Sequence, residues 1–203
     1  MTRDTTKQYD RAYFDKWYRS WDNKVSTAAE VRRKVAMAVS ISEYFLRRPL
    51  RSVLDIGCGE AAWLPHLRSM RQRIAYQGLD PSDYVVSRFG KSRNIRKASF
   101  ADLPQLDLGT TYDLVICSDV LHYVDEASIP AGIAAINRFA HGAAYIEVLT
   151  KEDDVIGDLD GLEQRPAAYY RKLLTKAGFV GVGPYTWLSP AISDIAAQLE
   201  MPR

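Results

Sequence analysis

Apolar runs typical of buried β-strands alternate with helical patterns from about residue 51 to residue 187. The expected strands cover residues 52–56, 73–79, 95–100, 112–118, 143–149 and 179–182. Apolar residues recur at helical spacing after Asp125, and another helical stretch over 165–177 has Pro166 in its first turn and Gly178 after its end. Strand and helix repeated in this way predict an α/β fold with a doubly wound, mostly parallel sheet.

The composition is that of one globular domain. The chain has 203 residues, of which 47% are hydrophobic and 26% charged, so we expect a single domain over 1–203. Within it, the patterns predict an N-terminal helical lid over 1–48 and an α/β core over 49–203. No apolar run reaches the ~18 residues of a bilayer span, and the charged N-terminal residues predict no secretory signal. With only two cysteines, a cytoplasmic protein without a membrane partner is expected.

Two helical patterns precede the first expected strand. The nearer one begins with Thr27 and Glu30 at capping-box spacing and continues as an apolar stripe to Phe45. The farther one is unusually rich in aromatic residues, namely Tyr9, Tyr13, Phe14, Trp17, Tyr18 and Trp21. Two interpretations remain open for these aromatic residues: a helix that packs on the sheet edge, or a lid over a flat ligand.

Charge is distributed unevenly along the chain. Residues 1–100 carry 20 Lys and Arg against 10 Asp and Glu, whereas residues 101–203 carry 7 against 15. Such a split occurs in proteins that bind an anionic partner and in domains whose two halves share surface charge. The second interpretation is favoured, because the longest basic block is the triplet Arg32-Arg33-Lys34. A nucleic-acid partner is therefore not expected.

The loop after the first expected strand carries the most specific pattern. Gly57, Gly59 and Ala62 match a dinucleotide-binding fingerprint, in which glycines let the backbone approach the ligand closely. Asp55 argues for another ligand, since a carboxylate here repels a pyrophosphate and attracts an ammonium or sulfonium group. Asp80 follows Gly59 at the spacing of a residue that accepts hydrogen bonds from ribose. The two carboxylates indicate a nucleoside with a positive charge.

At these residues the chain resembles the class I S-adenosylmethionine-dependent methyltransferases. The resemblance rests on Asp55-Ile-Gly-Cys-Gly-Glu-Ala, on Asp80, on Phe100-Ala-Asp102-Leu103 and on the stretch 112–122, and it covers roughly residues 50–185. It implies a Rossmann-like methyltransferase fold and S-adenosylmethionine as cofactor. It also implies a contact between the Asp102 position and the adenine amino group.

The residues expected to bind the cofactor follow from this resemblance. They are Asp55, Gly57, Cys58, Gly59, Asp80, Pro81, Ala101, Asp102, Leu103 and Ser118. Tyr13 and Trp17, together with Tyr9 and Phe14, are expected to pack on the adenosyl group or to face the sulfonium with their rings. Ala61 stands at the family's usual third glycine and narrows the backbone conformations of the turn. The family's seventh, antiparallel strand is left open here, because the tail after Pro190 is partly helical in pattern.

Two residues near the end of the fourth expected strand are candidates for catalysis. Methyl transfer can proceed by positioning alone, and a base helps only if the acceptor has a proton to lose. His122 is expected to act as this base or only to hydrogen-bond the backbone. Asp119 is expected to orient the acceptor or, again, only to bond the backbone. The scattered histidines, with no Cys/His pair at zinc spacing, predict no metal site.

The sequence favours a small-molecule acceptor that is methylated on oxygen or nitrogen. The Asn-Pro-Pro-Tyr motif of relatives that methylate nucleobases or glutamine is replaced by Ser118-Asp119-Val120-Leu121. The acidic segment from Glu147 to Glu163 is either a solvated loop or a mouth that attracts a cationic or amine-bearing acceptor. Two other functions remain open. A nicotinamide-dependent oxidoreductase leaves Asp55 unexplained, and a partner domain can keep the same fold without catalysis.

Overall fold

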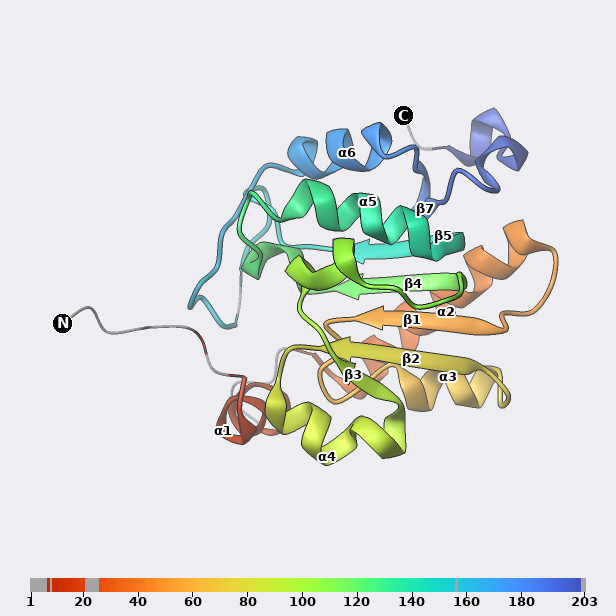
Figure 1. Ribbon diagram of the computed structural model, residues 1–203. Coiled ribbons are helices and arrows are strands. Elements are labelled where there is room, and N and C mark those ends of the chain that lie inside the picture. Colours follow the sequence, from red (N-terminus) through yellow and green to blue (C-terminus); the bar gives the residue numbers. More distant parts are fainter. Residues whose placement is uncertain (1–6, 8, 21–25, 156, 202–203) are drawn as a thin grey trace.

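The computed structural model describes residues 7, 9–20, 26–155 and 157–201. In these residues, seven strands form one sheet in the order β3-β2-β1-β4-β5-β7-β6 (Figure 1). The strands are β1 Ser52–Ile56, β2 Ala75–Asp80, β3 Ile95–Lys97, β4 Tyr112–Ser118, β5 Ala140–Glu147, β6 Val180–Gly183 and β7 Thr186–Leu188. β1 to β5 pair in parallel, and β7 lies antiparallel between β5 and β6. The predicted doubly wound, mostly parallel α/β fold is confirmed.

The seventh strand, which the sequence left open, is present but short. β7 pairs with residues 143–145 of β5, and Thr186 and Leu188 are fully buried in this position. The tail after Pro190 forms two short 3-10 helices, Ser193–Ile195 and Gln198–Glu200. The partly helical tail and the last strand therefore coexist.

Most strand boundaries follow the sequence pattern, with two informative differences. The first and fourth predicted strands coincide with β1 and β4, whereas β5 begins at Ala140, ahead of the predicted start. The third predicted strand ends early, at Lys97, because Phe100–Gln105 forms a 3-10 helix. A capping box between Ser99 and Asp102 begins this helix and competes with continued strand pairing.

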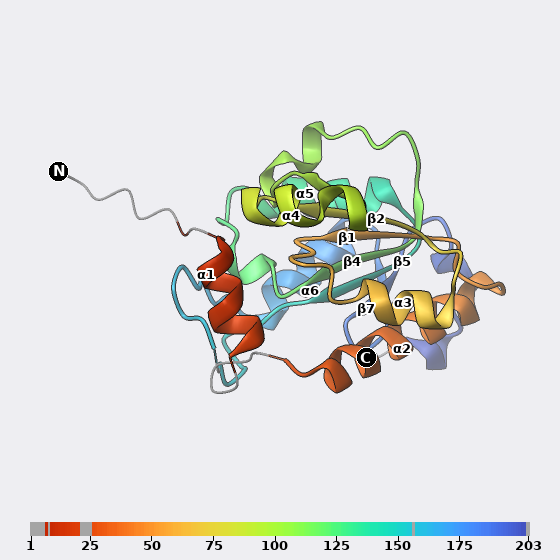
Figure 2. The same ribbon diagram turned by 90° about the horizontal axis from the view of Figure 1, so that it is seen from below.

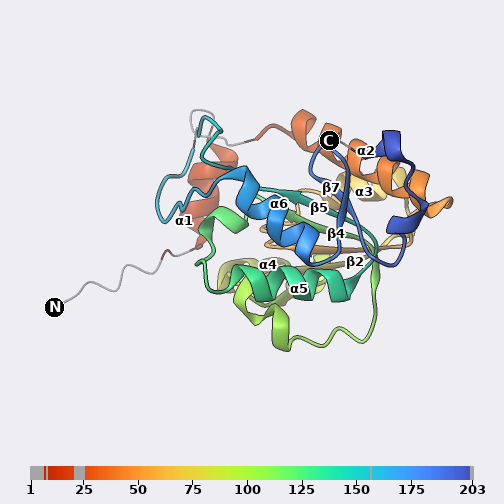
Figure 3. The same cartoon turned by 90° about the horizontal axis from the view of Figure 1, so that it is seen from above.

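Helices cover both faces of the sheet. They are α1 Arg11–Phe14, α2 Ala28–Leu46, α3 Leu64–Met70, α4 Asp83–Arg93, α5 Ile129–Phe139 and α6 Ala167–Lys176. α2 and α3 lie on one face and α5 on the other (Figures 2 and 3), and α6 packs on α5. α4 lies at the lateral edge of the sheet, where β3 is the outermost strand and β2 is its neighbour (Figure 1). Over the described ranges, no helix has both the length and the apolar character needed to cross a membrane.

The residues of β4 alternate between two apolar cores. Leu114 and Ile116 belong to the cluster that contains α2 and α3, whereas Val115 and Cys117 belong to the cluster with α5 and α6. All four side chains are fully buried. Because both faces are covered by helices, the strand is a continuous apolar run in the sequence.

The two N-terminal helices occupy different places. α2 begins with the predicted capping box of Thr27 and Glu30, and its buried residues Val35 and Val39 pack against the sheet. α1 instead lies beyond the carboxyl ends of β1 and β2 and continues as a π-helix over Asp15–Arg19 (Figure 1). The predicted division of the chain at residue 48 stays a prediction. Among the described residues before it, α1 and the π-helix lie over the carboxyl edge of the sheet.

Candidate active site

The loop between β1 and α3 makes a tight turn at the carboxyl end of β1. Gly57 and Gly59 have φ angles of +68° and +51°, in the left-handed region that glycine adopts without strain. The N–H groups of Gly57 and Cys58 donate to the Leu79 carbonyl oxygen at 2.8 and 3.1 Å, which ties the loop to β2. A Cβ atom on Gly57 would lie 2.4 Å from Cγ2 of Val120. The loop therefore depends on glycine at this position.

Ala61 occupies the position of the family's third glycine, and it has the backbone conformation that glycine would have. Its φ is +56°, and a residue with a side chain in this region costs roughly 1–2 kcal/mol. The methyl group is 1% exposed and belongs to the same apolar cluster as Trp63. Burial of the methyl group offsets part of the cost of the strained backbone.

Two buried carboxylates lie beside this loop. Asp80 is 5% exposed, and its two oxygens accept hydrogen bonds from the Gly59 N–H at 2.8 Å and the Ser82 N–H at 2.9 Å. Asp55 is 3% exposed and accepts a hydrogen bond from the Tyr76 hydroxyl at 2.8 Å. Burial raises the pKa of Asp55 to about 7; the Tyr76 hydrogen bond opposes this shift and the Asp80 charge adds to it. A bound cation would stabilise both carboxylates in their charged forms.

A cavity of about 300 Å³ opens beside the loop, at the lower end of the size range of ligand pockets. It brings together six of the predicted site residues: Asp55, Gly57, Cys58, Gly59, Ser118 and Asp119. Its walls also include Tyr18 of the aromatic segment and five side chains that the sequence analysis did not propose: Arg19, Thr27, Val31, Lys34 and Trp63. The cavity therefore lies between the carboxyl ends of β1 and β4, α2 and the π-helix.

One of the missed residues left a signal in the sequence. Thr27, Val31 and Lys34 follow one another at spacings of four and three residues, so they share one face of α2. Because Lys34 lies on the same helix face as the apolar Val31, the sequence indicated that this face contacts a polar group. Tyr18 belongs to the aromatic segment that the sequence analysis considered as a lid, whereas no pattern marks Arg19, whose position depends on how the N-terminal segment lies over the loop.

A polar cluster forms the wall of the cavity at the ends of β4 and β5. The Lys34 ammonium lies 2.7 Å from Oε1 of Glu147, and the Ser118 hydroxyl donates to Oε2 of Glu147 at 2.7 Å. Asp119 has a φ of +59°, and its exposed side chain lines the cavity. Burial and the Glu147 charge raise the pKa of Asp119 to about 6, with Lys34 opposing the shift. The wall thus contains a carboxyl group that titrates near neutral pH.

Five of the residues predicted to bind the cofactor lie outside the lining of this cavity: Asp80, Pro81, Ala101, Asp102 and Leu103. Leu103 is fully buried in the 3-10 helix after β3, whereas Ala101 and Pro81 are exposed. The Asp102 carboxylate accepts hydrogen bonds from the N–H and the hydroxyl of Ser99 at 2.8 and 2.7 Å. Asp102 therefore caps its own helix, and its contact with adenine stays a prediction.

His122, predicted to be a base or a structural histidine, is 1% exposed. Its Nδ1 accepts a hydrogen bond from the Leu149 N–H at 3.3 Å, and its ring packs edge-on against Tyr123. Burial, together with the charge of Lys7, lowers the pKa of His122 to about 4, so the imidazole is neutral at physiological pH. These contacts favour the structural interpretation, and a catalytic role stays a prediction. In the described part of the chain, no group of three or more His, Cys, Asp and Glu side chains is placed to hold a metal ion.

The aromatic residues of the N-terminal segment divide into two sets. Tyr13 and Trp17, predicted to contact the donor, are half-buried outside the cavity lining, and Trp17 packs under the Lys16 ammonium at 4.4 Å. Phe14 is 3% exposed and reaches the glycine loop, since a Cβ atom on Gly59 would lie 3.3 Å from Cε1 of Phe14. The contact with the loop is therefore made by Phe14, and donor contacts of Tyr13 and Trp17 stay predictions.

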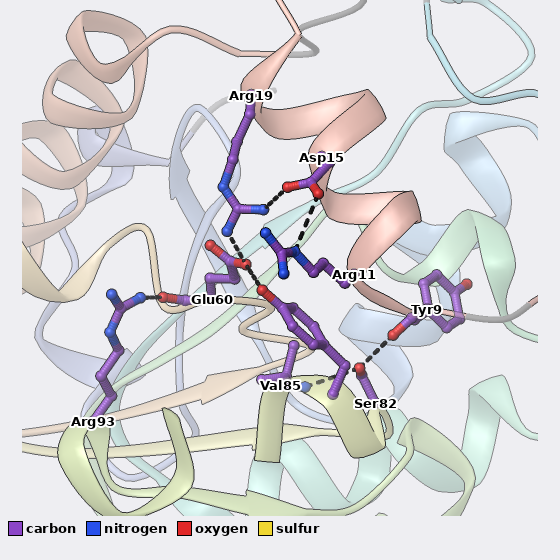
Figure 4. A network of polar contacts seen from close by, with 9 residues as sticks. Tyr9, Arg11, Asp15, Arg19, Glu60, Ser82, Val85 and Arg93 are labelled. Carbon is purple, nitrogen blue, oxygen red and sulfur yellow. Dashed lines mark hydrogen bonds and ion pairs between the residues drawn. The ribbon is translucent and has the colours of Figure 1, made fainter. Parts of the chain in front are cut away.

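Polar contacts hold the N-terminal segment over the loop (Figure 4). Arg19 forms an ion pair with Glu60 of the loop, and the Tyr84 hydroxyl of α4 donates to Glu60 at 3.2 Å. The Ser82 hydroxyl, at the start of α4, donates to the Tyr9 carbonyl oxygen. Since these partners lie on the loop and on α4, the segment covers the carboxyl edge of the sheet.

Comparison with known proteins agrees with this geometry. A family model described as a methyltransferase domain matches residues 19–182. The small RNA 2'-O-methyltransferase of Schizosaccharomyces pombe is 27% identical over 114 residues, which are 55% of this chain and 29% of that protein. The chain thus spans less than a third of the length of this curated relative.

Solved structures with the same fold include methyltransferases of several kinds. CalS10, an amino pentose methyltransferase from Micromonospora echinaspora, is 15% identical with a TM-score of 0.64, over 91% of this chain and 99% of that chain. The sugar N-methyltransferase KedS8 from a Streptoalloteichus species is 20% identical with a TM-score of 0.61, over 93% and 97%. At such identities these structures show the fold, whereas the family model, which covers most of the chain, shows the family. The chain therefore belongs to the class I S-adenosylmethionine-dependent methyltransferases.

Proposed function

We propose that the enzyme transfers a methyl group from S-adenosylmethionine to an oxygen or nitrogen atom of a small-molecule acceptor. The observation that carries this proposal is the N-terminal cover over the glycine loop. Arg19 is paired with Glu60, and Phe14 packs on the loop with 3% of its surface exposed. A covered cavity of about 300 Å³ favours an acceptor that enters whole over a polymer that lies in an open groove.

The residues around the cavity fit S-adenosylmethionine, which supplies a methyl group on a positively charged sulfur. Gly57 and Gly59 have no side chains of their own to keep a ligand away from the loop backbone. The Asp80 oxygens keep lone pairs that can accept the ribose hydroxyl groups in addition to their two backbone hydrogen bonds. Lys34 offers a positive charge to the α-carboxylate, and Asp55 offers a negative charge to the cationic groups.

The chain itself contributes position, charge and the exclusion of water to the transfer. The cover of α1 and the π-helix limits access of water to the cavity. The Asp119 carboxylate, which is open to the cavity and ionised above about pH 6, is proposed to accept the proton that an acceptor hydroxyl or amine loses. His122 is proposed to position the segment after β4 through its bond to Leu149.

The comparisons support a small acceptor without singling one out. CalS10 and KedS8, which cover nearly the whole chain, are methyltransferases of sugars by name. The Schizosaccharomyces pombe relative, named for small RNA, supports RNA as a competing acceptor. A nicotinamide-dependent oxidoreductase is not favoured, because the family match is to methyltransferases and Asp55 lies where a pyrophosphate would be repelled.

A panel of acceptors tests this function. Purified enzyme with S-adenosylmethionine is offered small alcohols and amines, including amino sugars, and in parallel a single-stranded RNA. We expect mass spectrometry to detect a methylated product from at least one small molecule and none from the RNA. A methylated RNA with no small-molecule product would contradict the small acceptor and leave the family assignment intact.

Donor affinity should fall as the pH falls through 6. With a pKa of about 6, the Asp119 carboxyl is ionised at pH 7.5 and about nine-tenths protonated at pH 5. Before an acceptor binds, the ionised Asp119 carboxylate is proposed to attract the ammonium group of the ligand together with Asp55, which lines the same cavity. Calorimetry with S-adenosylhomocysteine should then give about ten-fold lower affinity at pH 5 than at pH 7.5. Asp119→Asn should bind more weakly at pH 7.5 and lose the part of the fall centred near pH 6.

Adenosine is the matched ligand for this titration, because it lacks the amino-acid tail and its ammonium group. Its affinity should not depend on Asp119. An Asp119→Asn variant with the pH profile of the wild type would show that this carboxylate does not attract the ligand.

A further inference from the structure

The ammonium group of Lys7 is enclosed by three tyrosine rings and a carboxylate. We name this group of Tyr9, Tyr13, Tyr123 and Asp158 the tyrosine cage. The Lys7 Nζ lies 3.8 Å from the ring centroid of Tyr123 and 5.4 and 5.5 Å from those of Tyr13 and Tyr9. It also lies 2.5 Å from Oδ2 of Asp158. Aromatic faces around a cation, together with a carboxylate, form a site that recognises organic ammonium ions.

The tyrosine cage is shielded from water and internally bonded. The side chains of Lys7 and Asp158 are 14% and 8% exposed. The Tyr123 hydroxyl donates to the Asp158 carbonyl oxygen at 2.9 Å, and the Asp160 N–H donates to Oδ1 of Asp158 at 3.1 Å. The Asp160 carbonyl oxygen accepts a hydrogen bond from Lys7 at 2.8 Å. A shielded carboxylate without a cation is strongly unfavourable, so the cage requires a positive charge from some source.

Three segments that border the donor site meet in the tyrosine cage. Tyr9 and Tyr13 come from the N-terminal cover, and Asp158 comes from the loop after β5, which lies beside α1 (Figures 1 and 2). Tyr123 follows β4, shortly after Val120, whose side chain packs on the glycine loop. The cage is therefore at the same edge of the sheet as the cavity, on the side where the segments after β4 and β5 meet.

Lys7 can leave the tyrosine cage without loss of secondary structure. It precedes α1, which begins at Arg11, and it belongs to no helix or strand. Its ammonium group makes the polar and cation–π contacts with the cage. The walls are held by other means, since Tyr13 is part of α1 and Tyr123 is bonded to Asp158. Another molecule with an ammonium group can therefore replace Lys7 in an intact cage.

We propose that the tyrosine cage binds an ammonium group of the methyl acceptor, and that Lys7 fills the cage until the acceptor arrives. This inference rests on the proposed function and narrows the acceptor to molecules with a basic amine or a quaternary ammonium group. A protonated amine has no free electron pair, so the group in the cage anchors the acceptor and a different atom receives the methyl group. Asp158 gives part of the acidic segment after β5 a specific role in recognition.

The test compares n-butylammonium, which has the length and charge of a lysine side chain, with uncharged 1-butanol. In the wild type, the tethered Lys7 competes at an effective concentration of roughly millimolar. NMR titration of Lys7→Ala should therefore show affinity for n-butylammonium at least about ten-fold higher than in the wild type. The shifts should centre on Tyr123 and Asp158, and 1-butanol should bind to neither protein.

Three further variants complete the test. Lys16→Ala is the matched control, because it removes the same charge from the ring of Trp17, outside the tyrosine cage. Asp158→Asn in the Lys7→Ala background should abolish the gain in affinity. Lys7→Met keeps the apolar part of the side chain and serves if Lys7→Ala unfolds. The proposed role of the cage would be wrong if the wild type and the Lys7 variants bound n-butylammonium with equal affinity. It would also be wrong if the Lys7 variants bound 1-butanol as tightly as n-butylammonium. Unchanged affinity of the same variants for S-adenosylhomocysteine would leave the proposed function standing.

Discussion

Gly57→Val is expected to reduce the affinity for S-adenosylhomocysteine by at least about 100-fold. The new Cβ atom would lie 2.4 Å from Cγ2 of Val120, and a β-branched residue at a φ of +68° is a strong outlier. The overlap with Val120 can be removed only if the loop moves. A displaced loop no longer presents the backbone surface against which the ligand is proposed to lie. In the present loop conformation, overpacking of this kind costs about 1–3 kcal/mol of unfolding free energy. The left-handed conformation of a residue with a side chain costs roughly 1–2 kcal/mol more. Calorimetric titration measures the loss.

The control for Gly57→Val separates backbone strain from steric overlap. Gly109 has nearly the same φ, +64°, but a Cβ atom there would meet nothing within 4 Å. Gly109→Val should therefore keep the wild-type affinity and lose only roughly 1–2 kcal/mol of unfolding free energy. If Gly57→Val also keeps the wild-type affinity, the glycine loop is not where the donor binds.

Asp80→Ala is expected to weaken donor binding by about 1.5–3 kcal/mol, which is about 10- to 150-fold in affinity. The substitution removes the carboxylate proposed to accept the ribose hydroxyl groups. It also releases the N–H groups of Gly59 and Ser82, which the carboxylate holds at 2.8 and 2.9 Å. Calorimetry with S-adenosylhomocysteine measures the effect, and Asp80→Asn shows how much of it depends on the negative charge.

Asp107→Ala is the matched control for Asp80→Ala. The Asp107 carboxylate accepts a hydrogen bond from the Gly109 N–H at 2.8 Å, just as Asp80 does from Ser82 two residues later. This turn is exposed, and Asp107 bonds only within it, whereas Asp80 also holds Gly59 of the glycine loop. Asp107→Ala should leave donor affinity unchanged. A similar loss in both variants would mean that Asp80 only supports the fold.

The fold was largely predictable because its signals are local. β1 and β4 coincide with the predicted strands, since a strand covered on both faces must be apolar along its whole length. The capping box at Thr27 is likewise a contact between residues three positions apart. β7 was left open because its three residues join the sheet through pairing with β5, which lies far away in the sequence, as well as with the neighbouring β6.

The candidate site was predictable only in part, for the same reason. Asp55 and Asp80 end neighbouring parallel strands, so chain order alone brings them to one edge of the sheet. The environment of His122 depends on Leu149, and that of Asp119 depends on Lys34 and Glu147. Such environments decide whether a side chain titrates, packs or faces a ligand, and they were not visible in the sequence.

From the sequence alone came the doubly wound sheet, the glycine loop and the two carboxylates that are predicted to bind a cationic nucleoside, because each depends on spacing along the chain. Tertiary structure alone decided which aromatic residue reaches the loop and that Arg19 lines the cavity. It also decided that Lys7 is enclosed with Asp158. Contacts between residues far apart in the sequence arise when helices and loops pack on the finished sheet, and no short-range pattern encodes them.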